Sequence, residues 1–118
     1  MPRLRTGIVI VGYYATKIRR TLFAQNRELL KTGQLSPSEI ARSSAELNRK
    51  LYEVLVDRMV LSKGDAIRVD IEYGLENGRI VWNFGSLKLS VYRRVDPDTV
   101  EAALKIIHQE RLPLEAGE

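Results

Sequence analysis

The stretch AIRVDIEYGLENGRIVWNF, residues 66–84, decides the fold of this chain. Large apolar side chains alternate with polar ones from Ile67 to Leu75, which is typical of a β-strand with one buried face. Asn77-Gly78 then predicts a two-residue hairpin turn, because both central positions tolerate positive φ. The turn pairs Leu75 with Ile80, Tyr73 with Trp82 and Ile71 with Phe84. A one-residue slip would scatter these side chains over both faces, so the register is well specified.

The segment after this hairpin allows two interpretations. Gly85-Ser86 can form a second tight turn with glycine first, and a further strand then begins at Leu87 with its apolar side chains on the same face. The alternative is one long strand that bends through Gly85. We expect the first interpretation, and therefore two hairpins in succession.

Upstream of the hairpin the chain carries one strand signal and two helix signals. Residues 4–13 predict a strand that is apolar on both faces and needs cover on both. Residues 14–31 follow helical spacing, and Gly33 ends that helix because glycine adopts the left-handed conformation freely. Ser36-Pro37-Ser38-Glu39 combines a capping hydroxyl, an N-terminal proline and a glutamate, which predicts a second helix to about Leu61.

These elements predict the architecture. The link between the two helices is only about five residues, so the helices form an antiparallel hairpin. Asp96-Pro97-Asp98 predicts a last helix over residues 97–110. We expect an α+β fold in the order strand, helix, helix, three strands, helix, with the helical hairpin packed on the apolar face of a small antiparallel sheet. Residues 1–111 form a single domain, and residues 112–118 form a loose C-terminal tail.

Positive charge is concentrated in the first half of the chain. Residues 1–50 carry ten Lys and Arg against three acids, a net charge of +7, whereas residues 51–118 carry a net charge of −3. Such a surface attracts a polyanion, because long-range attraction and counterion release both favour binding. The alternative is a solvated cationic face without a ligand.

Two aromatic groups are candidate platforms for unpaired bases, which stack on rings beside arginines. The first is Tyr13, Tyr14 and Phe23, and of the adjacent tyrosines one can face the core while the other stays outside. The second is a ladder of three rings across two strands, which either forms the core beneath the helices or stays partly open to a cleft between sheet and helices. The candidate nucleic-acid-binding residues are Arg5, Tyr13, Tyr14, Lys17, Arg19, Arg20, Phe23, Arg27, Arg49, Tyr73, Trp82 and Phe84.

The residue types needed for catalysis are nearly absent. The chain has no cysteine, and His108 is its only histidine, so neither a catalytic triad nor a His/Cys metal cluster can be built. Asp70 and Glu72 alternate with apolar residues on a strand among arginines, which favours cross-strand ion pairs over acid–base chemistry. Gly7 and Gly12 flank a strand instead of forming a phosphate-binding turn after it. We expect a protein that is not an enzyme and that holds no cofactor and no metal.

Composition also bears on location. The absence of cysteine fits an intracellular, cytoplasmic protein. No apolar run of about 18 residues is present, so we expect no membrane-spanning segment. Few amide and many ionic side chains are typical of proteins from thermophiles.

Two segments carry a family resemblance. They are GYYATKIRRTLFAQ, residues 12–25, and residues 39–48, in which EIAR is followed by AELN. In these motifs, and over most of residues 6–104, the chain resembles the archaeal ThermoDBP-related family, akin to the single-stranded DNA-binding protein of the Thermoproteales. The resemblance implies a compact α+β domain that binds single-stranded nucleic acid without strong sequence preference, in a cleft with apolar walls and a basic rim. The larger relative adds a C-terminal leucine zipper, for which this sequence shows no heptads.

The sequence is compatible with two functions. The first is sequence-independent binding of single-stranded DNA or RNA, by base stacking on aromatic side chains and phosphate contacts from arginine and lysine. The second is a structural or protein-interaction module that acts as a homodimer, in which a partner covers the second apolar face of residues 4–13.

Overall fold

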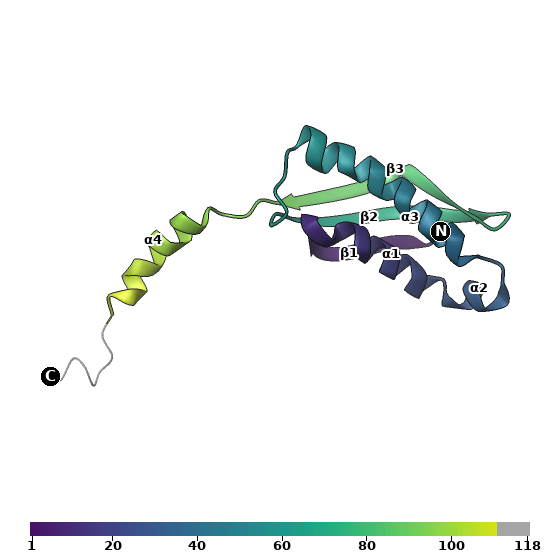
Figure 1. The fold of residues 1–118 in the computed structure, drawn as a ribbon, viewed down its shortest axis with the longest axis horizontal. Helices are drawn as coiled ribbons and strands as arrows, with labels where there is room; N and C mark the ends of the chain where they lie inside the picture. The colour runs from purple at the N-terminus through teal and green to yellow at the C-terminus, as the bar shows by residue number, and fades with distance from the viewer. Residues whose placement is uncertain (111–118) are drawn as a thin grey trace.

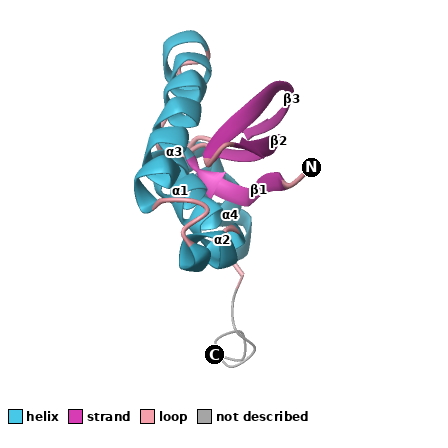
Figure 2. Cartoon of the chain, turned by 90° about the vertical axis from the view of Figure 1, so that its right-hand side faces the viewer, coloured by secondary structure: helices cyan, strands magenta, loops and turns pink. Residues whose placement is uncertain are grey.

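The structure is a computed structural model that describes residues 1–110. In this part of the chain a three-stranded antiparallel sheet, in the order β1-β2-β3, is covered on one face by helices (Figure 1, Figure 2). The α+β class is confirmed, and the predicted fourth strand is wrong. The elements in chain order are β1 (Arg3–Ile10), a 3₁₀ turn (Val11–Tyr13), α1 (Tyr14–Gln25), α2 (Arg27–Thr32), α3 (Pro37–Tyr52), a π-helical segment (Glu53–Arg58), β2 (Ala66–Glu76), β3 (Arg79–Tyr92) and α4 (Pro97–His108).

The hairpin between β2 and β3 forms in the predicted register. Tyr73 lies opposite Trp82, and Leu75 lies opposite Ile80. Asn77 and Gly78 take φ values of 51° and 77°, as a two-residue turn of this type requires. The alternation of β2 therefore places Ile67, Val69, Ile71 and Tyr73 in the core, as predicted.

The second turn, at Gly85-Ser86, does not form, and the predicted strand from Leu87 is instead the second half of β3. The alternative interpretation is confirmed, because β3 runs unbroken from Arg79 to Tyr92. The register shifts where Asp70 pairs with Lys88 but Glu72 pairs with Asn83, so residues 84–87 bulge out of the ladder and Phe84 is not paired with Ile71. The Ser86 hydroxyl stabilises the bulge, since it accepts the Glu72 N–H at 2.9 Å and donates to the Asn83 carbonyl at 2.7 Å.

α1 and α3 form one layer over the apolar face of the sheet (Figure 2). The predicted cap is present, because the Ser36 hydroxyl accepts the Glu39 N–H at 3.1 Å and Pro37 begins α3. Gly33 ends α2 in the left-handed conformation, as predicted. The fully buried side chains at the centre of this contact are Ile18, Leu22, Ile40, Leu47, Leu51, Leu55, Ile67 and Ile71.

The first predicted helix is divided in two at Asn26. The Asn26 side chain is buried, and it donates to the Leu22 carbonyl at 2.8 Å and lies 3.1 Å from the Tyr73 hydroxyl. A local side-chain hydrogen bond of this kind competes with the helical ladder, so α1 stops at Gln25 and α2 starts at Arg27. This break separates the two helices that border the candidate site.

The last helix does not cover the sheet. α4 stands apart from the rest of the fold, beyond the end of β3, and every one of its residues is exposed (Figure 1). The expectation that both faces of the first strand are covered is therefore wrong for this chain on its own, since Ile8 is 62% and Ile10 is 52% exposed. The predicted tail, residues 112–118, lies outside the described residues.

Candidate nucleic-acid interface

The outer surface of the helical layer is hollowed where α1, α2 and α3 meet. The cavity has a volume of about 660 Å³ and is called the arginine hollow below. Its lining residues are Arg19, Arg20, Phe23, Ala24, Arg27, Leu30 and Ala41. Arg19 and Phe23 are one helical turn apart on the same face of α1, and Ala24 and Ala41 are small enough to leave space between the helices.

The charge of the arginine hollow is uncompensated. Its lining contains three arginines and no acid, and among residues 1–110 none of the three lies within 4.0 Å of a carboxylate. The Phe23 ring is half-buried among them and packs against the core. Proteins that bind unpaired strands combine aromatic rings, on which bases stack, with basic side chains that contact the phosphates.

A second hollow continues along the outer surface of α1. It has a volume of about 410 Å³, and it shares Arg20 and Ala24 with the arginine hollow. Lys17 adds a further positive charge to its lining. The Tyr13 ring lies nearby, with its centroid 6.0 Å from the Arg20 guanidinium carbon. The structure thus brings together Tyr13, Lys17, Arg19, Arg20, Phe23 and Arg27 of the predicted site.

Tyr14 faces the core whereas Tyr13 faces solvent, as predicted for two adjacent tyrosines. Its ring is buried in the core, its hydroxyl lies 3.3 Å from the Asn48 carbonyl, and burial raises the pKa of that hydroxyl. Tyr13 is exposed at the surface. Only Tyr13 is therefore available to a base.

The aromatic ladder is mostly core. Tyr73 is 1% and Trp82 is 6% exposed, and their rings meet edge to face with centroids 5.4 Å apart. The Tyr73 hydroxyl donates to Gln25 at 2.8 Å, and the Trp82 indole N–H donates to the Ser43 carbonyl at 2.8 Å. Both rings are thereby held inside the fold, and only Phe84 is partly exposed, with the Lys50 ammonium 5.3 Å from its ring centroid.

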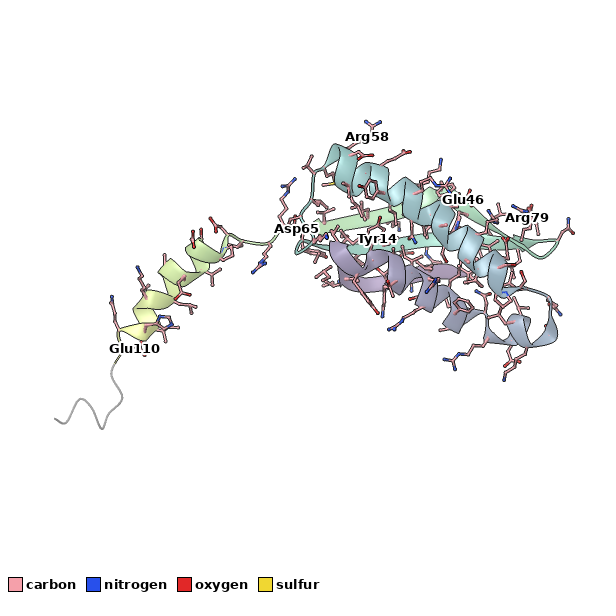
Figure 3. The ribbon with its side chains drawn as sticks, in the orientation of Figure 1. Tyr14, Glu46, Arg58, Asp65, Arg79 and Glu110 are labelled. Carbon is pink, nitrogen blue, oxygen red and sulfur yellow. The ribbon has the colours of Figure 1, made fainter. Side chains whose placement is uncertain are left out.

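A smaller hollow of about 190 Å³ lies between α3 and β3, where a cleft between helices and sheet was expected. Trp82, Phe84, Arg42 and Arg79 line it, the last near the hairpin end of the sheet (Figure 3). Its arginine charge is largely compensated, because the Arg42 guanidinium donates to Glu39 at 2.7 and 2.6 Å and to Glu46 at 3.4 Å. This hollow is smaller and far less cationic than the arginine hollow.

Two predicted site residues lie elsewhere. Arg5 is on the face of the sheet opposite the helices, where it lies 3.3 Å from Asp70. Arg3 also pairs with Asp70, at 2.7 Å, so that carboxylate takes part in cross-strand ion pairs. Arg49 is exposed on α3 and lines none of the three hollows.

Sequence reasoning did not find the apolar floor of the arginine hollow. Leu30 comes from α2 and Ala41 from α3, so they meet Phe23 only through the packing of three helices. An available signal was the alanine on the outer side of each of two amphipathic helices, since small exposed residues leave room between neighbouring side chains.

Comparison with known proteins identifies the family. The family model described as ThermoDBP-related, archaea, matches residues 4–81, which include all the helices that form the arginine hollow. The chain belongs to this ThermoDBP-related family. The resemblance seen in the sequence is thereby confirmed.

Two solved structures of ThermoDBP-related proteins are similar to the chain. The crystal structure of apeThermo-DBP-RP2 bound to ssDNA dT10 is 37% identical, with a TM-score of 0.88 over 92% of this chain and 50% of that chain. The structure of pfuThermo-DBP-RP1 is 34% identical, with a TM-score of 0.72 over 91% of this chain and 69% of that chain. The chain thus spans half the length of the first of these relatives.

Among curated proteins, none matches the chain. Within residues 1–110 no helix has the length and apolar character to cross a bilayer. The same residues contain no group of three or more His, Cys, Asp or Glu side chains placed to hold a metal ion.

Proposed function

We propose that this chain binds single-stranded DNA, largely independently of sequence, at the arginine hollow and the adjoining surface of α1. The observation that carries the proposal is the half-buried Phe23 ring, surrounded by Arg19, Arg20 and Arg27 with no acid among the lining residues. The bound dT10 in the structure of apeThermo-DBP-RP2 supports it.

The proposed mechanism combines stacking with phosphate contacts. One base stacks on Phe23 above the apolar floor, and stacking of this kind is worth about 1–3 kcal/mol per base and tolerates any base. The arginines of the rim hold the flanking phosphates, each with a salt-sensitive contribution from counterion release. The bound DNA strand continues over Lys17 toward Tyr13, whose ring can stack with a neighbouring base. This role is binding and not catalysis.

The proposal is tested by titrating the protein with fluorescently labelled oligothymidine at low and moderate salt. Phe23→Leu keeps an apolar side chain against the core but removes the ring, so we expect binding to weaken about 5- to 100-fold. Phe84→Leu is the matched control, because Phe84 is also a partly exposed ring beside a cation but lies in the less cationic hollow. Equal losses in both variants, or no binding by the wild type at low salt, would refute the assignment.

Two finer points stay predictions. RNA is a second candidate ligand, because stacking and phosphate contacts do not require deoxyribose. An oligouridine titration beside the oligothymidine one measures the preference. A cytoplasmic location is likewise expected from the composition alone.

Self-association is a second candidate function, and the exposure of α4 favours it. A helix of 12 residues is marginal in water without a partner, and α4 has an exposed apolar side. We therefore propose that the chain forms a homodimer. Light scattering on the purified chain measures it, and a mass of one chain at all concentrations would exclude it.

A further inference from the structure

α2 supplies two residues to the arginine hollow but no buried residue to the core. Arg27 and Leu30 line the hollow, whereas none of the six residues of α2 is buried. Leu29 and Leu30 are only partly buried against the core. A helix this short is not stable by itself. The position of α2, and with it the position of Arg27, therefore depends on the residues that hold its ends.

Asn26 holds the end of α2 that carries Arg27. Its backbone takes φ −116° and ψ 23°, outside the helical region. In a continuous helix its N–H would donate to the Leu22 carbonyl, but here it donates to the Phe23 carbonyl at 3.2 Å. The Asn26 side-chain amide replaces that N–H, because it donates to the Leu22 carbonyl at 2.8 Å. The Asn26 carbonyl accepts the Leu30 N–H at 3.0 Å, which closes the first turn of α2.

The same amide connects the break to the sheet. Asn26 is buried, and its amide also donates to the buried Tyr73 hydroxyl at 3.1 Å. Tyr73 donates in turn to the Gln25 side chain at 2.8 Å, and the Gln25 amide donates to the Arg3 carbonyl of β1 at 2.9 Å. A buried amide whose N–H groups are both bonded resists rotation, because rotation would leave polar groups unpaired. The direction in which α2 starts is therefore fixed from β1 and β2.

The direction of α2 decides which charge lies near Phe23. Glu28 follows Arg27 in the sequence, but it is exposed and does not line the arginine hollow. Successive helical residues point about 100° apart, so a rotation of α2 by one residue would exchange the guanidinium near Phe23 for a carboxylate. A carboxylate there would repel a phosphate.

We infer that Asn26 is a positioning residue for the binding of single-stranded DNA, which acts without contact to the DNA by holding Arg27 at the rim of the arginine hollow. The inference rests on the binding proposed above, and it gives a role to a buried side chain that does not line the hollow. Tyr73 then serves binding from inside the core, through its hydroxyl and not as a platform for a base.

A double-mutant cycle with Arg27 tests this role, because it separates positioning from stability. Near 50 mM salt we expect Arg27→Gln to weaken oligothymidine binding about eightfold in the wild type, but less than about twofold in an Asn26→Ala background. Arg19→Gln should cost the same in both backgrounds, because Arg19 lies on α1 before the break. Binding is titrated by fluorescence anisotropy at a temperature at which calorimetry shows every variant to be folded.

Tyr73→Phe and Tyr14→Phe form a matched pair of variants. Each keeps a buried ring and removes one hydroxyl. Only the Tyr73 hydroxyl accepts a hydrogen bond from Asn26, whereas the Tyr14 hydroxyl lies 3.3 Å from the Asn48 carbonyl. We expect Tyr73→Phe to reduce the cost of Arg27→Gln and Tyr14→Phe to leave that cost at about eightfold.

Three results would overturn the inference. If Arg27→Gln keeps its full cost in Asn26→Ala and in Tyr73→Phe, whatever the Tm of these variants, Asn26 serves stability alone. If Arg19→Gln loses its cost as well, the whole hollow has changed and not α2. If Arg27→Gln costs nothing in the wild type, the arginine hollow is not the binding site. Only this last result also refutes the proposed function, so the two failures are distinguishable.

Discussion

The charge of the arginine hollow predicts how binding depends on salt. If Arg19, Arg20 and Arg27 each neutralise one phosphate, the slope of log K against log salt is about −2, at roughly −0.7 per phosphate for single strands. Arg27→Gln removes one of these contacts, so the slope becomes shallower, at about −1.4. The same relation predicts that Arg27→Gln binds about eightfold more weakly than the wild type near 50 mM salt and less than twofold more weakly near 500 mM.

Fluorescence anisotropy of a labelled oligothymidine across a salt series measures both quantities. Arg58→Gln is the matched control, because Arg58 is also exposed and its loss changes the net charge equally, but it lies at the far end of the helical segment after α3 (Figure 3). We expect it to keep the slope of the wild type. Equal reduction of the slope by both variants would show that binding follows net charge, and an unchanged slope in Arg27→Gln would remove the arginine hollow from the interface.

Three further predictions concern single residues. Trp82 is the only tryptophan and is held in the core, so its emission should stay unchanged when oligothymidine saturates the protein; quenching would instead place bases in the hollow between α3 and β3. Glu39 accepts the Ile80 N–H at 2.8 Å, and hydrogen bonds from Arg42 lower its pKa below 4.5. This carboxylate therefore stabilises the fold above about pH 4.5 and less as pH falls through its lowered pKa, so the difference in Tm between wild type and Glu39→Gln should shrink from pH 6 to pH 3. Val60 is exposed at φ 53°, and Val60→Asn should raise Tm by about 4 °C because asparagine tolerates this conformation better; an unchanged Tm in a calorimetric scan would argue against strain at this residue.

Much of the fold could be predicted from residues close together in the sequence. The alternation in β2, the Asn77-Gly78 turn and the cap at Ser36 are local signals, and each acts as predicted in the structure. The prediction of a second turn was wrong because Gly85-Ser86 fits either a turn or a bulge. The choice depends on the Ser86 hydroxyl reaching the Glu72 backbone in the neighbouring strand.

The candidate site was predictable in part. Lys17, Arg19, Arg20 and Phe23 belong to one helix, so their spacing already placed them near one another. Tyr73 and Trp82 could not be assigned from spacing alone, because the same cross-strand pair serves either as core or as platform. Burial decided it, and burial depends on how closely α3 packs on β3 through Ser43 and Glu39.

By itself the sequence determined the α+β class, the hairpin register, the charge asymmetry and the family, because these follow from local periodicity, composition and short motifs. Only the tertiary structure decided which candidate binding residues lie together and which apolar surfaces stay uncovered. The arginine hollow needs three helices to meet, and the break at Asn26 depends in part on a hydrogen bond to Tyr73, 47 residues away. The exposure of α4 likewise appears only in the tertiary structure, because its amphipathic spacing alone does not show whether the helix packs on the sheet.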